Sequence, residues 1–250
     1  MHRRASPRAA ALLTVGLLAA LASLFAARPA AAADDDTLAR RARACTGCHG
    51  QQGRAAPDGY YPRLAGKPAA YLFDQLLAFR DGRRQYALMT HLLEPLSDDY
   101  LRDLAAYFAA LKLPYEPPLP LPPDLAADAA AQARARRLLT QGDAARQLPA
   151  CSACHGAELT GALPGVPALL GLPRDYLNAQ LGAWRTGTRA ARAPDCMADV
   201  ARRLAPDEVA LLAAWLAAQP VPTTGSAAAP VAALPQPMPL RCGTTVAVAP

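Results

Sequence analysis

The sequence contains little charge, few aromatic residues and only one long apolar run. Charged residues make up 18% and aromatic residues 6% of the chain, whereas apolar residues, alanine above all, make up 52%. That apolar share excludes a disordered chain, and the 25 prolines exclude a coiled coil. Because the one long apolar run lies at the N-terminus, a polytopic membrane protein is excluded as well.

The first 33 residues are typical of an export signal. Arginines at positions 3, 4 and 8 precede the apolar run 9–27, and Ala31-Ala32-Ala33 offers a cleavage site before three aspartates. Cleavage after Ala33 would remove four arginines and no acidic residue, and would lower the formal net charge from +6 to +2. Nucleic acid is therefore not a predicted partner. An uncleaved anchor, with loose membrane association, is the alternative; in both cases the folded part is expected in the periplasm.

Four of the six cysteines lie in two C-x-x-C-H motifs, residues 45–49 and 151–155. This motif attaches a c-type haem: two thiols bond the vinyl groups of one porphyrin, and the following histidine lies beneath the iron. A thioredoxin-like pair would need a preceding strand, which the sequence lacks, and a zinc site would leave two histidines unused. We therefore predict two covalently bound haems c. The residues predicted to hold them are Cys45, Cys48 and His49 in the first motif and Cys151, Cys154 and His155 in the second.

The two motifs belong to a tandem duplication. Cys45 and Cys151 are 106 residues apart, and Pro62-x-Leu64-x-Gly66 recurs at an offset of 105 as Pro167-x-Leu169-x-Gly171. Further pairs at this offset are Tyr71 with Tyr176, Gln75 with Gln180, Phe79 with Trp184, Arg80 with Arg185 and Gly82 with Gly187. Near the end of each repeat the offset is 108 and matches Leu96 with Leu204. Such a repeat predicts two similar structural units.

Each repeat has helical periodicity and no convincing strand pattern. Apolar spacing predicts helices over 69–79 and 175–184; capped or acidic first turns predict helices over 100–111 and 209–218. An Ala/Arg-rich helix is expected over 124–140. We predict an all-α protein with two domains, residues 34–113 and 124–220. A Pro-rich linker, 114–123, is expected between them, and an irregular Pro/Ala-rich tail, 221–250, after them.

Methionine is scarce, so its recurrence at matched positions of the repeat is informative about function. Apart from the first residue there are only three, and Met89 and Met197 each stand seven residues before the matched leucine of their repeat. Core packing is the usual role of methionine, but recurrence at one repeat position favours both residues as the distal iron ligands. Met238 has no repeat partner and is assigned no role. His91, two residues after Met89, is the rival ligand at the first haem.

Two prolines of the repeat are candidates for orienting the iron-binding histidines. A ligating histidine usually donates its second ring N–H to a carbonyl. Pro62 and Pro167 follow the haem motifs at equivalent positions, and the fixed φ of proline can hold such a carbonyl in place. The alternative is that both are ordinary turn prolines.

Two cysteines remain outside the motifs, Cys196 and Cys242. In an oxidising compartment leftover thiols tend to pair, and a Cys196–Cys242 disulfide would tie the tail beside Met197. It would stiffen the ligand loop or cover the haem edge. The alternatives are free or intermolecular thiols, and ligation of the second iron by a Cys196 thiolate.

Together these elements resemble the dihaem cytochrome c4 family. The resemblance rests on C-x-x-C-H-G, Pro-x-Leu-x-Gly, Tyr-x-x-x-Gln-Leu, the ligand methionine and a Leu-[Ser/Ala]-x-Asp helix start, and it covers about residues 40–219. It implies two class I cytochrome c domains and an electron carrier rather than an enzyme. The implied redox partners are a quinol-oxidising complex or a dehydrogenase as donor and a terminal oxidase as acceptor.

Two other functions stay open. The chain is alternatively the cytochrome subunit of a larger dehydrogenase or sulfur-oxidising complex, with the same chemistry and an obligate partner. A dihaem peroxidase is less favoured, because both repeats carry a methionine and the chain is short for that family. His/Met ligation would keep both irons six-coordinate and raise their reduction potentials, which suits an electron carrier with transient docking partners.

Overall fold

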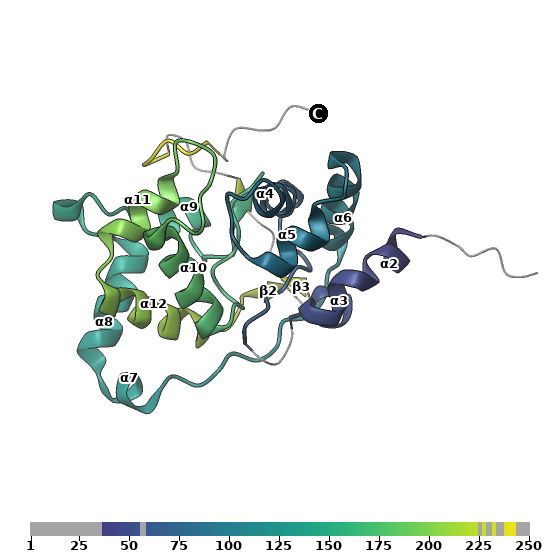
Figure 1. Ribbon diagram of the computed structural model, residues 1–250. Helices are drawn as coiled ribbons and strands as arrows, with labels where there is room; N and C mark the ends of the chain where they lie inside the picture. The colour runs from purple at the N-terminus through teal and green to yellow at the C-terminus, as the bar shows by residue number, and fades with distance from the viewer. Residues whose placement is uncertain (1–36, 56–58, 225–226, 229–231, 234–237, 244–250) are drawn as a thin grey trace, which may run out of the picture. The chain divides into compact units, whose positions relative to one another are not determined.

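The computed structural model describes residues 37–55, 59–224, 227–228, 232–233 and 238–243 (Figure 1). The predicted export signal, 1–33, lies outside the described residues. Within the described ranges, no helix combines the length and apolarity needed to cross a bilayer. The fold is mostly helical, as predicted, and its strands are only two residues long.

The first repeat, residues 38–111, folds around one hydrophobic cluster. Leu72 and Phe73 lie in the helix 69–80 and pack with Leu101 and Phe108 from the last helix of the repeat, 98–110. Leu101 is completely buried. The repeat contains α2 (Leu38–Arg41), α3 (Arg43–His49), the 3-10 helix η1 (Gln51–Gly53), α4 (Ala69–Arg80), α5 (Ala87–Leu93) and α6 (Asp98–Ala110).

The second repeat, residues 129–217, builds a cluster of its own. Leu138, Leu177 and Leu212 come from three different helices of the repeat and are all buried in it. The repeat contains α8 (Ala129–Thr140), the 3-10 helix η2 (Ala144–Arg146), α9 (Ser152–His155), β1 (Ala162–Leu163), α10 (Arg174–Thr186), α11 (Cys196–Arg203) and α12 (Pro206–Ala217). Helices α10 and α12 pack against each other, as α4 and α6 do in the first repeat.

The four helices predicted within the repeats are confirmed as α4, α6, α10 and α12, with ends shifted by up to three residues. The predicted cap of α6 is also present, because the Ser97 hydroxyl accepts a hydrogen bond from the Tyr100 N–H at 3.3 Å. The matched arginines play matched roles. Arg80 donates to the carbonyl of Leu96 and Arg185 to that of Leu204, so each ties the end of α4 or α10 to the turn before the last helix.

The helix predicted over 124–140 is wrong in one respect, because the chain breaks at Asp128 into α7 (Pro123–Ala127) and α8. Asp128 has extended φ/ψ, and its carboxylate accepts a hydrogen bond from the Ala131 N–H at 2.8 Å. A short acidic side chain gains more by capping a new helix than by continuing the old one. Residues 111–122, which include most of the Pro-rich segment, form no helix or strand.

The tail is less irregular than predicted. Strands β2 (Thr223–Thr224) and β3 (Ala227–Ala228) pair antiparallel, and β4 (Ala232–Ala233) pairs parallel with β1 of the second repeat. Two-residue strands carry too little alternation to be recognised in a sequence. The pair of β4 with β1 joins the tail to the second repeat.

Candidate functional site

The first C-x-x-C-H motif lines one side of a cavity within the first repeat. Cys45, Cys48 and His49 lie on α3, and Met89 reaches the same cavity from α5. The rest of the lining is mainly apolar, with Leu72, Leu104 and Phe108 among others. The structure thus brings together all four residues predicted for the first haem.

The second repeat forms the equivalent cavity. Cys151 and Cys154 line it with His155 from α9, and Met197 contributes from α11. His91 of the first repeat, the rival ligand, is exposed and lies outside the cavity that Met89 lines. Neither α5 nor α11 was predicted as a helix, because each is only seven or eight residues long and is too short to show a helical period in the sequence.

Both histidines are buried and oriented in the same way. The Nδ1–H of His49 donates to the carbonyl of Pro62 and that of His155 to the carbonyl of Pro167, each at 2.8 Å. The predicted role of the two prolines is confirmed. Burial lowers the pKa of both imidazoles, which favours the neutral ring. This tautomer leaves the Nε2 lone pair free for a metal.

The glycine after each histidine is required by the backbone. Gly50 and Gly156 have φ of 74° and 84°, where side chains are strained. A Cβ would lie 2.0 Å from the Ala55 oxygen in the first case and 2.7 Å from the Gly161 oxygen in the second. The turn lets each histidine carbonyl accept a hydrogen bond from the returning chain, at 2.9 Å from Ala55 N and 2.8 Å from Gly161 N.

The four motif cysteines are free thiols at the edge of mainly apolar cavities. None of the four is in a disulfide. Burial raises the pKa of Cys45 to about 11 and that of Cys151 to about 12. In each cavity two nearby thiols, a histidine with a free Nε2, a methionine thioether and an apolar wall fit the vinyl groups, iron and porphyrin of a haem c.

Three buried cations stand between the two cavities. Lys67, Arg84 and Arg189 are each only 4–8% exposed. Within the described residues, none of the three forms an ion pair with a carboxylate. Lys67 and Arg189 line both cavities, and burial lowers the pKa of each. Buried charges need partners, and the carboxylate groups of two haem propionate pairs would supply them.

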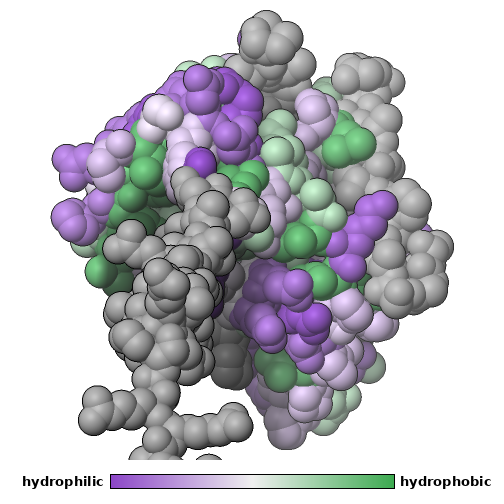
Figure 2. Space-filling model, turned by 90° about the vertical axis from the view of Figure 1, so that its right-hand side faces the viewer, coloured by the Kyte–Doolittle hydropathy of each residue, from purple (hydrophilic) through white to green (hydrophobic). Residues whose placement is uncertain are grey.

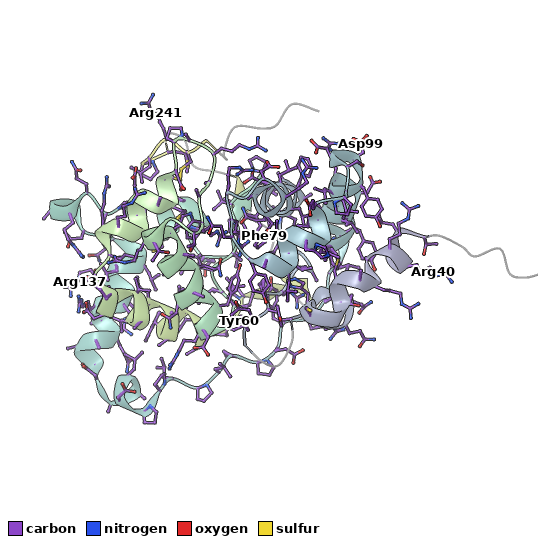
Figure 3. All side chains as sticks on the ribbon, in the orientation of Figure 1. Arg40, Tyr60, Phe79, Asp99, Arg137 and Arg241 are labelled. Atoms are coloured by element: carbon purple, nitrogen blue, oxygen red, sulfur yellow. A yellow bond between two sulfur atoms is a disulfide. The ribbon has the colours of Figure 1, made fainter. Side chains whose placement is uncertain are left out.

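The two arginines also join the repeats through a crossed network. Arg84 of the first repeat donates to Gln180 at 2.7 Å and Tyr176 at 3.0 Å in the second. Arg189 donates back to Gln75 at 2.7 Å. The backbones at 84 and 189 form an antiparallel bridge, and Arg84 stacks over the ring of Phe79, labelled in Figure 3, at 4.4 Å. The side chains that touch both cavities therefore also hold the repeats together.

The sequence contained a signal for these two arginines that a search for short motifs does not detect. Arg84 and Arg189 are 105 residues apart, the same offset as the recognised Tyr71/Tyr176 pair. Arginine is common enough at surfaces that the match alone does not indicate burial. Only the fold shows that both side chains point inward.

The remaining cysteines form the predicted disulfide. Cys196 and Cys242 are bonded, with Cα atoms 5.2 Å apart. A Cys196 thiolate ligand is therefore excluded, and the chain of the tail is fixed beside Met197. Met238, which was assigned no role, lines the second cavity together with Leu240.

Comparison with known proteins identifies the relatives of this chain. The cytochrome c family model matches residues 37–112. A thiosulfate dehydrogenase electron acceptor of Thiomonas intermedia (strain K12) is 40% identical over 85% of this chain and 94% of its own length. Cytochrome c4 of Pseudomonas aeruginosa is 34% identical over 74% of this chain and 89% of its own length.

Solved structures give the same picture. A reduced recombinant cytochrome c4 from Pseudomonas stutzeri superimposes with a TM-score of 0.61 at 30% identity, covering 72% of this chain and 96% of that chain. The thiosulfate dehydrogenase TsdBA from Marichromatium purpuratum also gives a TM-score of 0.61, at 38% identity over 70% of this chain. Our chain spans only 36% of that longer protein.

Proposed function

We propose a donor and a route for electrons through this chain on the premise that it belongs to the cytochrome c4 family. Members of this family are dihaem electron carriers, so the chain carries two covalently bound haems c and transfers electrons without catalysing a reaction of its own. The proposal is that its donor is a thiosulfate-oxidising dehydrogenase in the periplasm, and that a terminal oxidase is the eventual acceptor.

The residues proposed to hold the two haems are those predicted from the repeats. Cys45 and Cys48 form thioethers to the first haem and Cys151 and Cys154 to the second. His49 and His155 bind the irons through Nε2, each held by its proline carbonyl at 2.8 Å. Met89 and Met197, which line the same cavities, would provide the second protein ligand of each iron. When bound, each haem supplies one-electron redox chemistry, and the chain keeps the iron environment fixed between oxidation states.

The arrangement of the cavities supports exchange of electrons between the two haems. The two cavities share Lys67, Tyr71, Gln75, Tyr176, Gln180 and Arg189 in their walls. Only one layer of side chains therefore separates the sites. An electron that enters at one haem has a short path to the other.

The observation that carries the choice of donor is the similarity to named electron acceptors of thiosulfate dehydrogenase. Two such proteins align, from Thiomonas intermedia (strain K12) at 40% and Stutzerimonas stutzeri (strain A1501) at 35% identity. Each alignment spans over nine tenths of the relative. The second candidate, an independent carrier from a quinol-oxidising complex, rests on the similarity to proteins named cytochrome c4.

We place the docking surface for the donor at the rim of the first cavity. Tyr60, Leu88 and Leu92 line this cavity and are 49%, 64% and 41% exposed. Among the described residues, no exposed large apolar side chain lines the second cavity. On the face drawn in Figure 2, hydrophobic patches alternate with hydrophilic ones. Small apolar rims of this kind suit a transient redox contact.

Rapid mixing tests the donor. The oxidised holoprotein is mixed with a purified thiosulfate dehydrogenase and thiosulfate, and haem reduction is followed optically. We expect rapid reduction of both haems that requires enzyme and thiosulfate together. Reduction no faster than with thiosulfate alone, combined with rapid reduction by a quinol-oxidising complex, would favour the second candidate.

A matched pair of variants tests the docking surface. Leu88→Glu should lower the second-order rate constant of reduction at least fivefold, because it places a charge in an apolar contact. Leu119→Glu changes a leucine that is similarly exposed, at 58%, in the Pro-rich segment, and should change the rate less than twofold. Equal effects of the two substitutions would contradict the surface.

A further inference from the structure

We propose that the tail segment, residues 238–243, holds the Met197 helix closed over the second haem and makes that site slower to open than the first. The proposal uses the assignment of Met197 as an iron ligand and is independent of the identity of the donor. It concerns this chain's own residues and the access of outside ligands to one of two otherwise similar sites.

The tail segment is attached to the N-terminal end of α11 at two neighbouring points. The Cys242 sulfur is bonded to Cys196, the first residue of α11 and the residue before Met197. The N–H of Gly243 donates to the carbonyl of Pro194 at 2.9 Å. Any movement of α11 away from the cavity must therefore carry the tail segment with it.

The contact at Gly243 is a close fit between backbones. A Cβ on Gly243 would lie 2.4 Å from the Ala193 oxygen and 2.6 Å from the Arg192 oxygen. Only glycine allows the tail to approach this loop so closely. The same loop is joined to the first repeat, because Arg192 forms an ion pair with Asp74 at 3.0 Å.

The tail segment also forms part of the cavity wall. Met238 and Leu240 line the second cavity and are half-buried, and Cys242 is buried. The side chain of Arg241, labelled in Figure 3, is exposed, in agreement with the alternation of inward and outward residues along this segment. Earlier in the tail, β4 pairs with β1 and fixes the chain to the second repeat. The tail is thus anchored on both sides of the cavity wall it contributes.

The first site has no counterpart among the described residues. Met89 lies on α5, whose first turn follows Tyr86 and carries no disulfide, and the cavity rim there is exposed at Leu88 and Leu92. Dissociation of a methionine ligand requires local opening of the segment that carries it. Helix α5 is held to α4 only by packing and by the Thr90 hydroxyl, which donates to the Phe79 carbonyl at 3.1 Å, among the described contacts. A helix that is also tied to a disulfide-bonded tail opens less often than one without such a tie, so the two irons should differ in ligand exchange.

The test is imidazole binding to the ferric holoprotein by stopped-flow. We expect two phases of equal amplitude, of which the fast one comes from the first haem. In the Met89→Ala variant the rate of the fast phase should no longer be limited by dissociation of a methionine ligand. Replacing both cysteines of the disulfide, Cys196→Ser with Cys242→Ser, should accelerate the slow phase at least tenfold and leave the fast phase within twofold. A single wild-type phase, an unchanged slow phase, or equal acceleration of both phases would overturn the proposal.

A second pair of variants avoids changing the disulfide. Met238→Ala removes a side chain of the cavity wall and should accelerate the slow phase by several fold, whereas Arg241→Ala, in the same segment but exposed, should have no effect. If Met238→Ala instead lets half of the ferrous haem bind carbon monoxide while Met197→Ala does not, Met238 is itself the ligand and the proposal is wrong.

Discussion

Replacing Glu208 by glutamine should destabilise the protein at neutral pH and have progressively less effect as the pH falls toward 2. The Glu208 carboxylate, at the start of α12, is 3% exposed. It accepts hydrogen bonds from Arg146 at 2.8 and 2.9 Å, from Arg134 at 2.9 Å and from the Ala205 N–H at 2.9 Å. Arg146 lies in η2, just before the second haem motif, so this carboxylate joins the motif loop to α8 and α12.

The size of the effect follows from the pKa of Glu208. The Arg146 contacts are the main cause that lowers it from 4.5 to about 2, even though burial opposes the shift. This difference corresponds to roughly 3 kcal/mol of linkage. The two arginines are 35% and 43% exposed, and solvent screening reduces the expected value to about 2 kcal/mol.

The pH dependence has a definite sign. Because the pKa is lower in the folded state, the stabilisation by Glu208 is complete above pH 4.5 and is lost as the pH falls toward 2. The Glu208→Gln variant should therefore unfold about 2 kcal/mol more easily than the wild type at pH 7, and this difference should shrink steadily as the pH is lowered toward 2.

Denaturant unfolding of the holoprotein between pH 2.5 and 7 provides the measurement. Asp207→Asn is the control, since Asp207 is 65% exposed and, in the part of the chain that the structure describes, bonds only to Arg134; it should cost less than about 0.5 kcal/mol at any pH. A deficit of Glu208→Gln that is the same at pH 3 and pH 7 would refute the reasoning, because loss of packing alone does not titrate.

Three further results are expected at the haem sites. Met89→Ala and Met197→Ala should each open one iron, so that carbon monoxide changes the spectrum of half of the ferrous haem; no change in one of them would remove that residue from the ligand set. Arg189→Gln should lower both reduction potentials by about 50 mV, because loss of a buried cation favours the more positive ferric state. Spectroelectrochemical titration measures this, and Arg241→Gln, at an exposed position, should give no shift. Gly156→Ala should reduce covalent haem to about one per chain by mass spectrometry, since its Cβ would lie 2.7 Å from a carbonyl oxygen at φ 84°; full loading would contradict the argument.

The sequence by itself determined the chemistry and the repeated architecture. Two C-x-x-C-H motifs, a fixed offset between matched residues and two recurring methionines are local or periodic signals, and they identified two haems in a mostly helical chain. The prolines that orient His49 and His155 were predictable for the same reason, because a repeated proline at a fixed distance fixes a carbonyl. The disulfide followed from counting the cysteines left over.

Only the tertiary structure decided how the repeats meet and what the tail does. The inward direction of Arg84 and Arg189 depends on contacts between residues about a hundred positions apart, which no local pattern encodes. At Asp128 the chain can either continue one helix or end it and cap the next one. The helix propensity of aspartate does not decide between these two outcomes. Met238 gained its place in the second cavity wall because a disulfide and a pair of two-residue strands return the tail to the second repeat. Long-range pairing of this kind is chosen by the packed fold, where the entropy of closing the loop is offset by contacts that exist only after folding.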